Sequence, residues 1–178
     1  MDVKNSARKI SSVNLLALLA RLILGGALLY AGILKALHPY QAAAAVRAYE
    51  ILPVSIANPL GYTLPWIEIG VGLLLILGLF VRVSALMGSL MMLVFIIGVS
   101  SAWARGLSID CGCFGGGGTV DPSKTAYPAE IIRDAIFFLS GAFLLWRPGS
   151  LWSLDSIGSG RIEPDSYEDE FDVDEMEG

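Results

Sequence analysis

The chain has 178 residues, of which 54% are hydrophobic and only 16% are charged. A soluble domain of this length carries about a quarter charged residues, so the composition predicts an integral membrane protein and excludes an ordinary soluble domain. The net charge of −5 hides two opposite parts: residues 150–178 carry ten acidic residues against one basic, and residues 1–149 carry seven acidic against eleven basic. Neither part indicates nucleic-acid binding, and no such partner is expected.

Four apolar segments each approach the length of about 20 residues that crosses the hydrocarbon core of a bilayer. These predicted spans are residues 13–37, 60–81, 84–103 and 128–146. The first span is too long for the apolar part of a signal peptide, so it is expected to be retained. Between the first two spans, the stretch 41–50 lies between Pro39 and Pro53 and predicts a short amphipathic helix at the membrane interface.

The predicted fold is therefore all-α, an integral membrane four-helix bundle with a short interfacial helix between spans 1 and 2. We expect residues 1–12 to form a cytoplasmic segment and residues 13–149 to form the membrane domain. Residues 150–178 are acidic and poor in large apolar side chains, which predicts a disordered tail. This tail is either a solvated, solubilising segment or a docking segment for a basic partner.

An even number of spans places both termini on one side of the membrane. The basic N-terminus and the short connection at Arg82 favour the cytoplasmic side for both. The expected localisation is the plasma membrane, as a multi-pass protein. The loop between spans three and four then lies outside the cytosol, in a compartment where disulfides persist.

The two cysteines of the chain, Cys111 and Cys113, lie in this loop and are separated only by Gly112. A disulfide between them would close a very small ring, contribute little stability and be easy to reduce. The pattern therefore favours a dithiol that exchanges with a partner over a permanent clip or an inert buried pair, and we expect the neighbouring glycines to expose it. Two thiolates also suit Cu(I), which stays as an alternative ligand. Arg105 or Arg133 would favour the thiolate if either folds close to the loop.

Charged residues inside the predicted spans form a second candidate site. Arg21 in span one and Glu68 in span two are each expected about 12 Å deep from opposite faces of the membrane. Because an unpaired charge there is costly, the sequence predicts that these two residues pair inside the bundle. The pair either fixes helix packing or serves a proton relay or a quinone site. Arg133 and Asp134 in span four either extend this polar cluster towards the cysteine loop or cap their helix.

Two motifs carry a family resemblance. The stretch from Gly26 to Lys35 and the Pro65, Glu68, Gly72 pattern resemble the DoxX-like membrane family. The Cys-Gly-Cys-Phe-Gly run at 111–115 is similar to the MauE branch of that family, the methylamine-utilisation membrane proteins. The resemblance covers about residues 15–146. It implies a redox-associated membrane protein that works beside a thioredoxin-like partner in extracytoplasmic disulfide formation or thiol transfer.

By motif match, Cys111 and Cys113 carry over as the redox pair. The expected function is to assist extracytoplasmic thiol–disulfide exchange, as a component of a thiol–disulfide oxidoreductase that relays redox equivalents to a thioredoxin-fold partner. No cofactor is required by the residues, and a quinone is the one candidate. Two alternatives stay open: a non-catalytic scaffold that anchors a soluble redox enzyme at the bilayer, and a small transporter that uses Arg21 and Glu68. A role in methylamine metabolism is not implied, because no residue of the chain indicates a binding site for that substrate.

Overall fold

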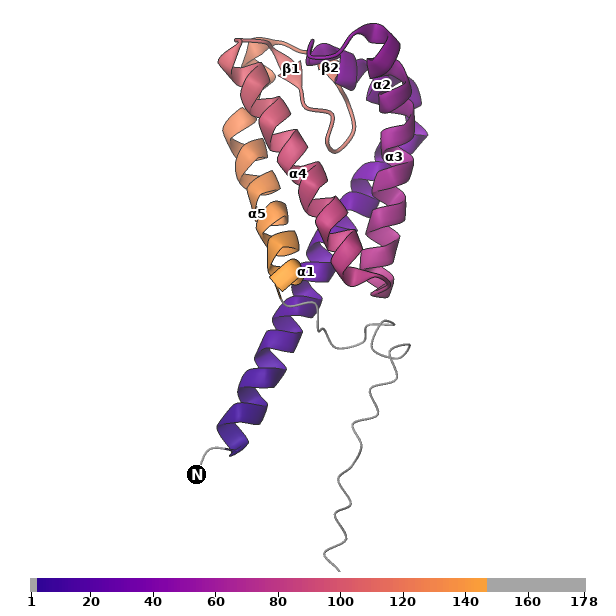
Figure 1. The fold of residues 1–178 in the computed structure, drawn as a ribbon. Coiled ribbons are helices and arrows are strands. Elements are labelled where there is room, and N and C mark those ends of the chain that lie inside the picture. Colours follow the sequence, from indigo (N-terminus) through magenta and orange to yellow (C-terminus); the bar gives the residue numbers. More distant parts are fainter. Residues whose placement is uncertain (1–2, 147–178) are drawn as a thin grey trace, which may run out of the picture.

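The computed structural model describes residues 3–146, with side chains from residue 14 onward. The predicted disordered tail at 150–178 lies outside the described residues. Five helices account for most of the described chain, and a two-stranded hairpin and a short 3-10 turn connect the last two helices (Figure 1). The helices are α1 (Val3–Leu37), α2 (Pro39–Ala48), α3 (Val54–Leu77), α4 (Val81–Ala104) and α5 (Tyr127–Trp146).

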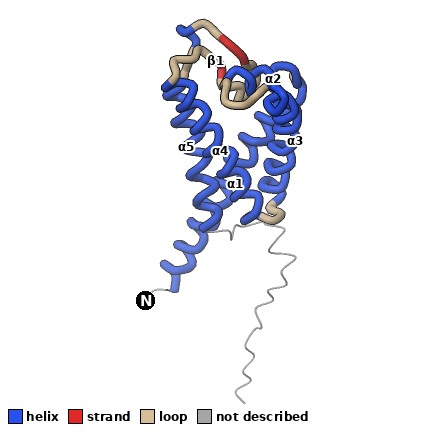
Figure 2. Tube along the Cα trace, turned by 45° about the horizontal axis from the view of Figure 1, so that its top comes forward, coloured by secondary structure: helices blue, strands red, loops and turns tan. Residues whose placement is uncertain are grey.

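The hairpin that joins α4 to α5 was not predicted from the sequence. Its strands are β1 (Ile109–Asp110) and β2 (Gly118–Thr119), which pair antiparallel, and the 3-10 turn Pro122–Lys124 follows. Figure 2 shows the hairpin at the end of the molecule where α2 also lies. The loop between the two strands turns inward among the helices rather than outward (Figure 1).

Three helices are long and apolar enough to cross a membrane: Asn14–Leu37 within α1, Val54–Leu77 and Val81–Ala104. Their outer faces expose many large apolar side chains, including Leu22, Leu73 and Leu90. Such continuous exposure is expected when lipid rather than water surrounds a protein. The mostly helical membrane architecture is thus confirmed. The fourth span stays a prediction, because α5 has the length but carries three charged residues in its first two turns.

A short helix is present where the interfacial helix was predicted; it is α2, which lies a little earlier in the chain than expected, and its place at the interface stays a prediction. It begins at Pro39, a residue that suits the first position of a helix because it has no N–H to satisfy. Its buried residues are all alanines, and they pack closely on α3. A Cβ atom at Gly61 of α3 would lie 2.5 Å from the Cα atom of Ala43. Small residues on both helices therefore allow this contact.

Glycines set the register of α1 against α3. A Cβ atom at Gly72 would lie 2.8 Å from both the Gly25 carbonyl oxygen and the Leu29 amide nitrogen. A Cβ atom at Gly32 would lie 2.8 Å from the Pro65 carbonyl oxygen. The two helices run antiparallel, with Gly25 level with Gly72 and Gly32 level with Pro65.

This register shows that the predicted pairing of Arg21 with Glu68 is wrong. Glu68 lies level with about residue 29 of α1, so Arg21 is about eight residues, or ~12 Å, further along that helix. The structure instead pairs Glu68 with Lys35, with 2.5 Å between Nζ and Oε1. Side chains on a helix lean towards its N-terminus, which brings Lys35 to Glu68 and carries Arg21 away from it.

Candidate functional site

Tyr127, the first residue of α5, anchors the start of the hairpin. Its hydroxyl donates to the Leu107 carbonyl oxygen at 2.5 Å and accepts from the Ile109 amide at 3.0 Å. Tyr127 is itself buried against the end of α4. Strand β1, and with it the cysteine loop that follows, is therefore held to the top of α5.

The cysteine loop packs closely against α2. A Cβ atom at either Gly112 or Gly117 would lie 2.5 Å from the Cβ atom of Ala45. Both glycines have a positive φ, of 67° and 122°, which a residue with a side chain rarely adopts. Asp110 closes the turn by accepting a hydrogen bond from the Gly112 amide at 2.9 Å. Only glycine fits these two positions.

Both cysteines carry free thiols and both are buried, with 8% of Cys111 and 5% of Cys113 exposed. The prediction that the neighbouring glycines expose the pair is therefore wrong. The glycines have the opposite effect, because they let the loop lie close to α2 and turn inward. Tyr49, directly after α2, further holds the loop by donating its hydroxyl to the Cys111 carbonyl oxygen at 3.1 Å.

The two thiols interact with each other and differ in acidity. The Cys113 amide donates to the Cys111 sulfur at 3.4 Å. A hydrogen bond from the Cys113 side chain lowers the pKa of Cys111. The same hydrogen bond, together with burial, raises the pKa of Cys113 well above the usual value for a thiol. Cys111 is thus the more acidic of the two thiols.

One face of α5 borders both cysteines. A carboxylate oxygen of Glu130 lies within 4.8 Å of the Cys111 sulfur, and Arg133 is close enough to interact electrostatically with the cysteines. The Arg133 guanidinium also lies 4.5 Å from the centre of the Phe114 ring and 2.9 Å from a carboxylate oxygen of Asp134. The structure therefore places Arg133 and Asp134 beside the cysteine loop. A cation at Arg133 favours the thiolate of Cys111.

Arg105, the other arginine that the sequence suggested as a partner of the thiols, instead binds backbone carbonyl oxygens. Its guanidinium donates to the backbone carbonyl oxygens of Tyr49 and Ser101. It therefore ties the end of α4 to the end of α2.

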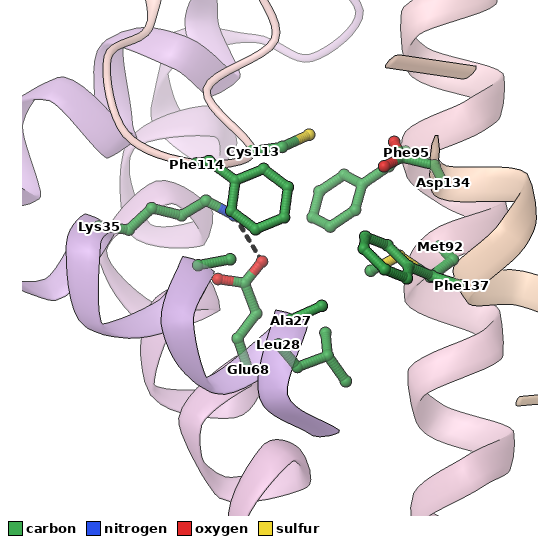
Figure 3. Close-up of a pocket in the computed structure, with 11 residues that line it drawn as sticks. Ala27, Leu28, Lys35, Glu68, Met92, Phe95, Cys113, Phe114, Asp134 and Phe137 are labelled. Carbon is green, nitrogen blue, oxygen red and sulfur yellow. Dashed lines mark hydrogen bonds and ion pairs between the residues drawn. The ribbon is translucent and has the colours of Figure 1, made fainter. Parts of the chain in front are cut away.

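Beneath the cysteine loop lies a small cavity with a volume of about 10 Å³, about what one water molecule requires (Figure 3). Its polar lining residues come from three helices and the loop: Lys35, Glu68, Asp134 and Cys113. The Lys35 ammonium lies 4.9 Å from the centre of the Phe95 ring, which forms part of the apolar wall. The Lys35–Glu68 ion pair thus belongs to the same site as the cysteines.

Two carboxylates on this cavity each keep one unused oxygen. Glu68 is 0% exposed and Asp134 is 2% exposed. Among the described residues, neither the Oε2 atom of Glu68 nor the Oδ2 atom of Asp134 has a hydrogen-bond partner. An unsatisfied buried oxygen is costly, so these two atoms mark the cavity as a place where a polar group is needed.

A second, larger pocket of about 520 Å³ lies between α2, α3 and α4. Its lining is apolar apart from the Tyr49 hydroxyl, which is already donated to the cysteine loop. Phe95 lines this pocket on one side and the small polar cavity on the other.

The sequence analysis missed three residues that contact the site, and two of them had a weak signal. Lys35 ends the glycine-rich stretch of span one. Glu130 lies four residues before Asp134, which places both on one face of a helix. Tyr49 gave no signal, because its contact with Cys111 spans 62 residues of sequence.

The thiol of Cys111 and the carboxylates of Asp110 and Glu130 offer three ligand atoms within 4.8 Å of one another. One sulfur with two hard oxygens is a mixed donor set, whereas Cu(I) selects soft thiolate and thioether ligands. The arrangement therefore suits thiol chemistry better than copper binding.

Comparison with known proteins places these residues in context. Residues 13–147 match the family described as methylamine utilisation protein MauE. A relative from Methylorubrum extorquens, named "Methylamine utilization protein MauE", is 34% identical over 88 residues, which cover 49% of this chain and 47% of the relative. The match thus spans about half the length of that relative. No solved structure matches the chain.

Proposed function

The chain belongs to the MauE family of methylamine utilisation proteins, and from this premise we propose that it assists thiol–disulfide exchange through Cys111 and Cys113. The observation that carries this proposal is the pair of free thiols with opposite pKa directions, one beside Arg133 and one facing the buried cavity. Such a division suits an attacking thiol and a resolving thiol.

The exchange has two steps. The Cys111 thiolate attacks a disulfide of a partner protein, which forms a mixed disulfide and releases one partner thiolate. Cys113 then loses its proton and attacks the Cys111 sulfur, which forms the Cys111–Cys113 disulfide and releases the second partner thiolate. The partner gains two electrons and this protein loses them, and the reverse sequence oxidises a partner dithiol. A thioredoxin-fold protein is the proposed partner, because that fold carries the matching pair of cysteines.

The proposal includes a topology. With α5 as the fourth span, both termini lie on the cytoplasmic side of the plasma membrane and the cysteine loop lies outside. The loop would then work in a compartment where disulfides form and persist. Because both thiols are buried, the loop has to move off α2 before a partner reaches Cys111. The run Gly115 to Gly118, in which every residue has a positive φ, supplies the backbone freedom for this movement.

A scaffold that anchors a redox enzyme is the second candidate, and the burial of both thiols supports it. In that case the cysteines would be inert packing residues. The transporter alternative loses its basis, because it required an Arg21–Glu68 pair and Glu68 pairs with Lys35.

Thiol trapping in cells separates exchange from the scaffold. Cys113→Ser should accumulate a reducible adduct of higher mass with an extracytoplasmic protein, because Cys111 attacks and nothing resolves the bond. Cys111→Ser and the double variant should accumulate none, and they are the matched controls. All three variants should keep the fold, since a crosslink across one residue adds little stability. If Cys113→Ser traps no protein and stays fully active, exchange is refuted and the scaffold takes its place.

A further inference from the structure

The buried cavity beneath the cysteine loop has a lining that the two-step exchange alone does not explain. Cys113 faces a space for one water molecule together with two carboxylates, each of which has an unused buried oxygen. We propose that this cavity is a proton-transfer site, in which one water molecule carries the proton of the Cys113 thiol to the carboxylate of Asp134. This inference rests on the proposed function, because the proton has to leave Cys113 before that thiol resolves a mixed disulfide.

The second step of the exchange needs a base beside Cys113. A thiol with a raised pKa is protonated at neutral pH and is a poor nucleophile. Cys113 is 5% exposed, so the groups nearest to its thiol are those that line the cavity, and we expect one of them to take the proton.

Asp134 is the carboxylate best placed to accept this proton. It is close enough for its charge to act on Cys113, and both residues lie on the loop side of the cavity (Figure 3). Its Oδ1 atom forms an ion pair with the Arg133 guanidinium, and its Oδ2 atom has no hydrogen-bond partner among the described residues. Glu68 is less suitable, because its partner Lys35, rather than Glu68 itself, is the group of that ion pair that acts on Cys113.

The charges around the cavity balance before and after the transfer. Lys35 faces it from α1, Glu68 from α3, and Arg133 and Asp134 approach from α5, so two cations accompany two carboxylates. The lining residues from α4, Met92 and Phe95, carry no charge. When the proton moves, the charge on Asp134 disappears as a thiolate forms on Cys113. The net charge of the buried site is therefore constant, which avoids the cost of creating a new buried charge.

The geometry also gives each thiol its own carboxylate. Glu130 contacts Cys111, and Asp134, one turn later on the same face of α5, serves Cys113. Arg133 lies between them in sequence and pairs with Asp134 at 2.9 Å. Asp134 would thus act in the second step of the exchange and not in the first.

A small coloured disulfide, dithio-bis-nitrobenzoate, measures the two steps separately on the full chain in detergent. Attack by Cys111 releases the first nitrothiolate, and resolution by Cys113 releases the second. At neutral pH, Asp134→Asn should slow the second phase by about a hundredfold, the lower end of the range for a general base. The gap should close at alkaline pH, where Cys113 ionises without help. The first phase should keep its rate, and Asp134→Glu should restore the second.

A second variant tests the water and keeps every charged residue. Ala27 lines the cavity, and Ala27→Val would fill the space for a water molecule. It should slow the second phase and leave the first unchanged. An unchanged second phase in Ala27→Val or Asp134→Asn overturns the inference, as does equal slowing of both phases. A wild-type protein that releases no second nitrothiolate would instead overturn the proposed exchange itself.

Discussion

The buried ion pair between Lys35 and Glu68 predicts a specific pattern of stability losses. Glu68 is 0% exposed and Lys35 is 6% exposed, and their charged atoms are 2.5 Å apart. Removing one partner of such a pair typically costs about 3–5 kcal/mol, because the other charge is left buried. We expect Glu68→Gln to cost about 3 kcal/mol, since the remaining ammonium keeps the Phe95 ring and the glutamine oxygen as partners.

The converse substitution should cost more. Lys35→Met leaves a carboxylate whose second oxygen has no partner among the described residues, so a loss of about 5 kcal/mol is expected. The double variant Lys35→Met with Glu68→Leu removes both charges and should recover most of either loss. The free energy of unfolding is measured by denaturant titration in detergent.

Arg21 supplies the matched control for this experiment. Arg21→Met combined with Glu68→Leu should show losses that add within about 0.5 kcal/mol, because groups more than 7–10 Å apart rarely couple. Strong coupling between Arg21 and Glu68, with additive losses for Lys35 and Glu68, would refute both the helix register and the ion pair.

Three other outcomes follow from close contacts and from the acidity of the thiols. Gly72→Ala should destabilise the protein by about 1–3 kcal/mol, because the new methyl group would meet α1 backbone atoms at 2.8 Å. Its matched control, Gly70→Ala on the same helix, meets no atom within 4 Å and should be neutral or stabilising. Tyr127→Phe removes a hydroxyl with two hydrogen bonds and should cost about 1–3 kcal/mol and speed hydrogen exchange in the cysteine loop. In Cys113→Ser the serine hydroxyl keeps a hydrogen bond to Cys111, which lowers the pKa of that thiol. The alkylation rate of Cys111, measured against pH, should therefore have its midpoint below the usual thiol pKa of about 8.5. A midpoint above that value would contradict the assignment of Cys111 as the attacking thiol.

The helices were predictable because each apolar run is local and long. The predicted boundaries differ mainly at the start of α3, which begins at Val54 rather than Leu60. Pro59 favoured a start after it, yet both Pro59 and Pro65 lie inside α3, so this helix forms without the hydrogen bonds that their nitrogens cannot donate.

The side-chain pairs were harder to predict, since they depend on register and on long-range packing. The depth argument for Arg21 and Glu68 assumed where each span meets the membrane, whereas glycine contacts decide how α1 slides along α3. The exposure of the cysteines was also misjudged. Glycines near a loop indicate a flexible backbone when only the local sequence is considered. In the structure, Gly112 permits close contact with Ala45, which is 67 positions earlier in the chain.

Phe95 has a consequence beyond its contact with Lys35. Its ring is a shared wall between the polar cavity under the loop and the apolar pocket of about 520 Å³ between α2, α3 and α4. The buried charges are thus separated from hydrocarbon by the thickness of a single aromatic ring. A small side chain at this position would merge the two spaces and let acyl chains reach the ion pair, where desolvation would penalise both charges. Phe95 therefore keeps the buried charges apart from the apolar pocket.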